Sequence, residues 1–279
     1  MERINFKMER DLGTTLQDAS TFIKQHFINI MKPTLIVAVI PLVIGGFLMM
    51  TGMQDFYGNM DQMRDPSGMM SFISGMFSSY FFVMLAFIMA YIMIIGYIKL
   101  YVSGQEVISL NDLTGILKDN ILTLFLSSII LVIVTYIGMF LCLLPGIYLA
   151  VVFAHFYAIA IIEDSGFGNT WSRCFKLIKD NWWSTFGLYV VTYLIAIGIM
   201  ILFYIPMYVI IGIDMFNSIQ QNDPEAIMNS MSKTTYIIPF YYMLGLINVL
   251  LFAVVSTFRY YTLVENKEGT GEQELINKL

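Results

Sequence analysis

The 279-residue chain is short of charged residues. Asp, Glu, Lys and Arg make up 13% of it, hydrophobic residues make up 58%, and the mean hydropathy is +0.73. Soluble globular domains carry about 25% charged residues, so this composition excludes that class and indicates an integral membrane protein. The net charge of -5 is spread over loops and ends. Nucleic-acid binding needs a concentrated basic face, so we expect no nucleic-acid partner.

Cysteine and histidine are also scarce, with two of each. Cys142 and Cys174 fall on opposite sides of the membrane in the topology derived below, which excludes a disulfide between them and a thiolate metal site. His26 and His155 fall at different levels, which excludes a multi-histidine centre. The sequence has no phosphate-binding glycine loop, nucleophile elbow or metalloprotease pair. We therefore expect no cofactor, no resident metal and no catalytic residue.

Long stretches have no charged residue at all. They run over 33–54, 66–98, 120–162, 181–213 and 234–258. A helix crosses the bilayer core in about 20 residues, so four of the stretches hold one crossing each. The third is roughly twice the length that one crossing requires. It contains Leu143-Leu144-Pro145-Gly146, a sequence typical of a tight turn, and so holds two crossings.

The sequence therefore predicts an all-α, polytopic fold of six transmembrane helices arranged as three hairpins. The expected spans are 34–53, 77–101, 121–141, 146–162, 186–214 and 236–260. Among the fifteen Lys and Arg residues, only Arg64 and Lys233 lie on the outer side if both ends of the chain are inside. The positive-inside rule thus predicts a multi-pass protein of the inner (cytoplasmic) membrane with cytoplasmic N- and C-termini. The expected parts are a cytoplasmic segment 1–32, a membrane domain 33–262 and a cytoplasmic tail 263–279.

A short amphipathic phrase occurs three times, each time just before an outward crossing: FIKQHFI at 22–28, ILKDNIL at 116–122 and LIKDNWW at 177–183. Its pattern predicts an amphipathic surface helix before each hairpin. Lys24, Lys118 and Lys179 hold the same place in the phrase and can reach anionic headgroups. We favour topological anchoring as the role of the phrase, with specific lipid recognition as the alternative.

Near the third copy, Arg173 and Lys176 precede Lys179 at three-residue spacing, and Glu163-Asp164 ends the fourth span. These charges can pair locally or bind a lipid phosphate. We favour local ion pairs and keep Arg173 and Lys176, together with the three lysines of the phrase, as candidate lipid-headgroup contacts.

The fourth span carries a small residue at every fourth position: Gly146, Ala150, Ala154 and Ala158. Such a stripe lets helix backbones approach closely in lipid and places this helix at the centre of the bundle. Pro41 and Pro206 fall inside the first and fifth spans and predict kinks, because each removes a backbone hydrogen bond.

Inside the predicted bilayer, His155 is the one titratable imidazole and Asn248 is the other notable polar group. A lone histidine is most often a neutral, hydrogen-bonded packing residue, and the alternative is a ligand or a proton relay. We keep both residues as a candidate intramembrane polar site.

Methionine is frequent at 21 residues. Eight lie in the first outer loop and its flanks: Met49, Met50, Met53, Met60, Met63, Met69, Met70 and Met76. Thioethers can hold Cu(I), but the irregular spacing and the lack of supporting Cys or His favour apolar filling instead.

The segment IIEDSGFGNTWSRCFKLIKDNWWSTFGLYVV and the opening RDLGTTLQDASTFIKQHFINIMKPTLIVAVIPLVI resemble the YciC-like and glycerophosphodiester phosphodiesterase membrane-domain families. The resemblance implies a bacterial six-helix membrane protein of a family whose role is largely unassigned. Where a phosphodiesterase is fused to such a domain, its catalytic part is a separate soluble barrel, for which this sequence has no room.

The sequence thus predicts a non-enzymatic bacterial inner-membrane protein that organises the envelope by contacts with lipid or a membrane protein, or with a second copy of itself. The first alternative is a carrier or channel-like protein for a lipid or small apolar solute. The second is a membrane enzyme at the cytoplasmic face, which would need several polar groups to converge near Glu163 and Arg173.

Overall fold

A computed structural model describes residues 3–58, 66–220, 227, 230 and 232–269 of the chain. The described residues are helical and loop segments with no strand among them. The helices are α1 (Leu12–Gly58), α2 (Pro66–Val102), α3 (Leu110–Leu141), α4 (Leu143–Phe153), α5 (Phe156–Ile162), α6 (Phe167–Ile178), α7 (Trp182–Gln220), the 3₁₀ turn η2 (Thr235–Ile237) and α9 (Ile238–Glu268). Six helical stretches are long and apolar enough to cross a membrane, which confirms the predicted all-α, multi-pass protein.

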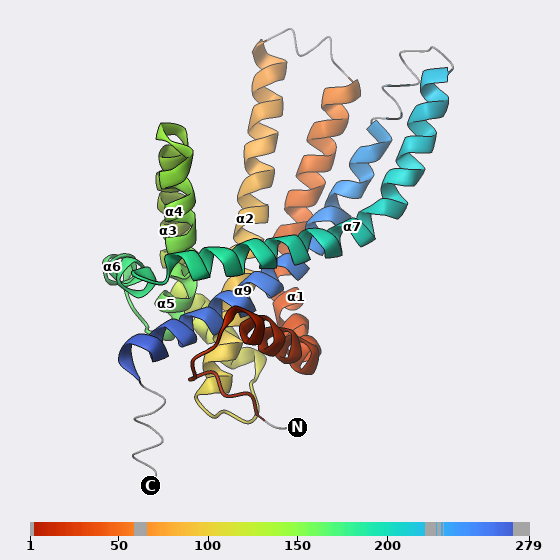
Figure 1. Ribbon diagram of the computed structural model, residues 1–279. Helices are drawn as coiled ribbons and strands as arrows, with labels where there is room; N and C mark the ends of the chain where they lie inside the picture. The colour runs from red at the N-terminus through yellow and green to blue at the C-terminus, as the bar shows by residue number, and fades with distance from the viewer. Residues whose placement is uncertain (1–2, 59–65, 221–226, 228–229, 231, 270–279) are drawn as a thin grey trace. The chain divides into compact units, whose positions relative to one another are not determined.

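The chain divides into two compact units. Four long helices, α1, α2, α7 and α9, each belong partly to one unit and partly to the other. Unit 1 comprises Met1–Leu35, Ile88–Leu194 and Val249–Leu279, and unit 2 comprises Ile36–Phe87 and Ile195–Asn248. Unit 1 contains the whole of α3, α4, α5 and α6, and α3 and α4 lie side by side in it (Figure 1).

The segment before α1 is built into the core of unit 1. Phe6 is 2% exposed and stacks on Phe258 with ring centroids 4.1 Å apart. Arg10 pairs with Asp18 at 2.8 Å and lies over the Phe258 ring. Phe6 and Arg10 are therefore packed against α9, and the cytoplasmic location of the segment 1–32 stays a prediction.

At two of the three copies of the phrase, the segment predicted as an amphipathic surface helix is continuous with the span that follows it. The first copy belongs to α1, which continues without a break from Leu12 to Gly58. The second belongs to α3, which starts at a capping box in which Ser109 and Asp112 bond each other's backbone N–H. A helix that starts at a strong cap and meets no breaker runs on into the span.

Only the third copy lies at the end of a separate surface helix, α6. There Asp180 takes a left-handed conformation with φ of 70°, which ends α6 before α7 begins at Trp182. Lys267 donates through Nζ to the carbonyls of Lys176 and Lys179, at 2.6 and 2.9 Å. A cation bound to the free carbonyls at the end of a helix stabilises that end.

The turn between α3 and α4 is tighter than predicted. Cys142 alone separates the two helices, with an extended backbone at φ of -165°. Pro145 and Gly146 lie in the first turn of α4, where a proline loses no hydrogen bond because those N–H groups have no intrahelical acceptor. The expected loop over Leu143–Gly146 is therefore helical.

The fourth predicted span is two helices, α4 and α5, with a break at Ala154 and His155. No proline causes the break. By contrast, α1 and α7 continue through Pro41 and Pro206, and the kinks expected at those residues stay a prediction.

Small residues of the stripe have two different roles. A Cβ atom on Gly146 would lie 2.6 Å from the backbone nitrogen of Met139, so this position permits the close approach of α3 and α4, as predicted. Ala158 is buried, whereas Ala150 and Ala154 line a cavity. The stripe thus both packs two helices together and leaves space between others.

Candidate functional site

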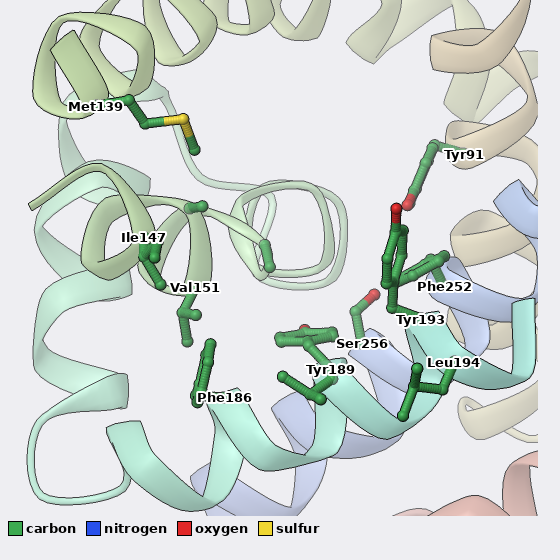
Figure 2. Close-up of a pocket in the computed structure, with 13 residues that line it drawn as sticks. Tyr91, Met139, Ile147, Val151, Phe186, Tyr189, Tyr193, Leu194, Phe252 and Ser256 are labelled. Atoms are coloured by element: carbon green, nitrogen blue, oxygen red, sulfur yellow. The ribbon is translucent and has the colours of Figure 1, made fainter. Parts of the chain in front are cut away.

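The strongest candidate site is a cavity of about 390 Å³ inside unit 1. We call it the tyrosine cavity. Its wall is apolar apart from the hydroxyl groups of Tyr91 on α2, Tyr189 and Tyr193 on α7, and Ser256 on α9. Met139, Ala150, Ala154 and Phe252 complete much of the wall. Figure 2 shows the hydroxyl groups of Tyr91, Tyr193 and Ser256 directed into this space.

Helical spacing explains why these residues face one space. Phe186, Tyr189, Val190 and Tyr193 recur at three- and four-residue intervals and share one face of α7, and Phe252 and Ser256 share a face of α9 in the same way. The volume lies within the roughly 300–1,000 Å³ of small-molecule sites, and a mostly apolar wall with a few oriented polar groups is their usual chemistry.

The break between α4 and α5 borders the tyrosine cavity. Ala154 lines it, and the next residue, His155, is 0% exposed. The Nε2 atom of His155 lies 3.3 Å from the hydroxyl of Tyr189, a second wall residue. Its Nδ1 atom makes no hydrogen bond within the described part of the chain. The predicted packing histidine is therefore satisfied at one nitrogen only.

A second space of about 390 Å³ lies beside α3 and α4 and shares Met139, Ala150 and Ala154 with the tyrosine cavity. The hydroxyls of Ser128 and Tyr157 hydrogen-bond to each other in its wall. The small residues of α4 thus separate two adjacent spaces in unit 1.

Asn248 belongs to unit 2 and His155 to unit 1, so the polar site predicted from these two residues stays a prediction. Its Oδ1 atom is buried and makes no hydrogen bond to the residues that the structure describes. Unit 2 has a cavity of its own, of about 340 Å³, where Tyr204 and Tyr241 stack with ring centroids 4.8 Å apart.

Arg259 is the residue that sequence reasoning missed. It is 4% exposed, and two hydroxyl groups hold its guanidinium: Nε donates to Thr185 Oγ1 at 3.0 Å and Nη2 donates to Ser184 Oγ at 2.6 Å. The span expected from the sequence, 236–260, ends one residue after it. The apolar run YYTLV that follows it, at 260–264, was the signal that it lies inside the helix.

A charged cluster ties α6 to α9. It consists of Glu163, Arg173, Tyr260 and Glu268, which we call the Glu163 cluster. Oε1 of Glu163 accepts hydrogen bonds from Arg173 Nε and from Tyr260, each at 3.0 Å. Arg173 also pairs through Nη1 with Glu268 at 2.6 Å. The hydrogen bond to Glu268, followed by that to Glu163, raises the pKa of Arg173 above its usual value.

The local ion pair predicted for Arg173 is confirmed by these contacts. Lys99 forms a second ion pair with the neighbouring carboxylate Asp164 at 2.6 Å. Lys24, Lys118, Lys176 and Lys179 have exposed side chains with no ion pair among the described residues. Their contact with lipid headgroups stays a prediction, and only Lys176 and Lys179 lie on the same short segment.

The two cysteines are free thiols, and they differ in environment. Cys142 is exposed in the α3–α4 turn, whereas Cys174 on α6 is 0% exposed. Burial raises the pKa of Cys174 to about 12. A thiol with so high a pKa is a poor nucleophile, because the thiolate is the reactive form.

In the methionine-rich segment, Met60 and Met63 lie outside the described residues.

Comparison of the chain with protein-family models, with curated proteins and with solved structures gave no match. The resemblance to the YciC-like and phosphodiesterase membrane-domain families stays a prediction. The site must therefore be interpreted from its own geometry.

Proposed function

We propose that this multi-pass protein is a non-enzymatic lipid-binding protein of the bacterial inner membrane, with both termini in the cytoplasm. In this proposal it holds the apolar part of a lipid in the tyrosine cavity and so contributes to the organisation of the envelope. The observation that carries the proposal is the cavity itself, with about 390 Å³ of space and a wall that is apolar between four hydroxyl groups. Apolar surface of this kind favours a hydrocarbon occupant over water.

Two neighbouring valines allow a matched test. Val190 lines the tyrosine cavity and is 40% exposed, whereas Val191 does not line it and is 41% exposed. Val190→Phe should reduce the space for a ligand, while Val191→Phe adds the same side chain on another face of α7. Native mass spectrometry in mild detergent should find a retained lipid on the wild type and on Val191→Phe but much less on Val190→Phe. Equal lipid occupancy in all three proteins would count against the proposal.

A carrier for a lipid or small apolar solute is the second candidate, and the break at Ala154–His155 favours it. Discontinuous helices border the substrate sites of many transporters, because the free backbone groups at a break bind ligands and the two halves can move separately. Proteoliposomes containing a fluorescent lipid would separate the two functions. Accelerated transfer between leaflets supports the carrier, whereas a bound lipid without transfer supports the binding protein.

A membrane enzyme is the third candidate. It would need several polar groups to converge near Glu163 and Arg173, and some do converge there. The convergent groups are engaged with one another in hydrogen bonds and ion pairs. The adjacent thiol of Cys174 is fully buried. This arrangement is better suited to fastening α6 against α9 than to activating a nucleophile.

A further inference from the structure

The search for further chemistry leads to Arg259, a buried cation without a carboxylate partner among the residues that the structure describes. A charge taken out of water is costly unless an opposite charge compensates it. The hydroxyls of Ser184 and Thr185 satisfy two donors of the guanidinium but supply no negative charge. An ionisable residue within a membrane span most often marks a site whose partner carries the opposite charge.

Arg259 and its partner Thr185 lie on the two helix faces, of α9 and α7, that line the tyrosine cavity. On α9, Phe252, Ser256 and Arg259 are spaced by four and three residues and share a face. On α7, Thr185 lies one turn before Tyr189, again on the same face. The cation is therefore about one helical turn beyond the wall of the cavity.

One hydrogen-bond partner of the buried guanidinium lies at the surface of unit 1. Ser184, which accepts its Nη2 hydrogen bond, is exposed, whereas Thr185 is 0% exposed. A headgroup at the Ser184 edge could approach the guanidinium while its hydrocarbon chain extends past Ser256 into the cavity. Arginine suits such a role because its planar fork can bind a carboxylate or a phosphate with two hydrogen bonds.

We infer that the occupant of the tyrosine cavity is an anionic amphiphile, whose carboxylate or phosphate head pairs with Arg259. This inference rests on the proposed function, since it names the class of lipid that the cavity takes. It adds a specific requirement for negative charge, which a purely apolar site lacks.

Trp182 supplies an internal reporter for the test. Its ring stacks on Phe186, which lines the cavity, with centroids 5.2 Å apart. Dibromostearic acid, dibromostearyl alcohol and the phosphate ester of that alcohol share one quenching tail and differ only in the head. Each is titrated into the purified full-length protein in mild detergent, and the tryptophan fluorescence is measured. Val190→Phe and Val191→Phe establish whether the quenching comes from the cavity.

The wild type should bind at least one of the two anionic probes about tenfold or more tightly than the alcohol, because a charge-assisted pair forms only with the former. Preference for the carboxylate or for the phosphate identifies the head, and either supports the inference. Arg259→Gln should lower the ratio to about one. Because that change sits in the core, Ser184→Asp is the second variant: it places a carboxylate beside the guanidinium at an exposed position and should abolish the preference. Val191→Phe, which changes neither the cavity wall nor Ser184, should keep it.

The failures of the two proposals are distinguishable. If the alcohol binds in the cavity as tightly as both anionic probes, or if Ser184→Asp keeps the preference for an anion, the inference is overturned while the lipid-binding function stands. If no probe gives quenching that Val190→Phe weakens, the lipid-binding function itself is overturned.

Discussion

Tyr260 on α9 donates its hydroxyl hydrogen bond to Glu163, 97 residues earlier at the end of α5, across 3.0 Å. The same carboxylate oxygen accepts the Nε–H of Arg173 on α6. One carboxylate thus joins three helices of unit 1. Its neighbour along the chain, Asp164, has a different role, because it forms an ion pair with Lys99 and its side chain is 73% exposed.

Glu163→Gln should therefore destabilise the protein much more than Asp164→Asn. The first change removes the negative charge on which Arg173 and Tyr260 converge, and we expect a loss of about 1–2 kcal/mol. The second breaks an exposed ion pair worth about 1 kcal/mol or less. Asn tolerates the left-handed backbone of Asp164, where φ is 47°, so the control introduces no strain. Thermal unfolding in detergent measures both, and equal losses would show that the cluster has no special weight.

The two cysteines should react with a maleimide at very different rates. Cys142 is exposed, whereas Cys174 is buried and its pKa is raised to about 12. At pH 8 roughly one Cys174 thiol in ten thousand is ionised, and deprotonation becomes substantial only near pH 12. Mass spectrometry should show one label on the folded protein and two after denaturation. Cys142→Ser should take up none while folded. Rapid labelling of Cys174 in the native protein at pH 7 to 9 would contradict its burial.

Gly146→Ala should destabilise the contact of α3 with α4. The added Cβ atom would meet the backbone of Met139 at 2.6 to 2.7 Å, and a backbone cannot move aside as a flexible side chain can. Overpacking of this kind costs about 1–3 kcal/mol. Gly115→Ala is the control, since a Cβ there meets nothing within 4 Å and alanine is the better helix former by about 1 kcal/mol. Unfolding midpoints should thus move in opposite directions, down for Gly146→Ala and up for Gly115→Ala.

Replacement of aspartate by glycine should have opposite effects in two copies of the same tripeptide, Lys-Asp-Asn. Asp180 has φ of 70°, which glycine adopts without cost, so Asp180→Gly should stabilise the protein by about 0.5–1 kcal/mol. Asp119 is inside α3, where glycine is the poorer residue, and Asp119→Gly should destabilise it by about 0.5 kcal/mol. Thermal unfolding of the two variants and the wild type measures both changes in stability. A shared direction of change would mean that backbone conformation is not what distinguishes the two copies.

Some parts of the candidate site could be predicted from the sequence. His155 stands out because a polar imidazole inside an apolar span is rare, and the structure indeed places it next to the tyrosine cavity. The ion pair of Arg173 with Glu163 follows from basic and acidic residues flanking a short turn. The role of Arg259 could not be predicted in this way, since its partners Ser184 and Thr185 are about 75 residues away and neutral.

The sequence by itself determined the class of the protein and its helices, because in lipid a long run of apolar residues can satisfy its backbone only as a helix. It did not determine where helices stop. Lys118-Asp119-Asn120 remains helical in α3, where the Asn120 side chain bonds to the carbonyl of Ile116 at 2.9 Å. Lys179-Asp180-Asn181 leaves the helix, where Lys267 of α9 binds the carbonyls of Lys176 and Lys179 instead. Identical residues thus have two conformations, and a contact from a distant part of the chain accompanies the difference. The tyrosine cavity and the break beside it likewise exist only in the tertiary structure, because their walls come from helices far apart in the sequence.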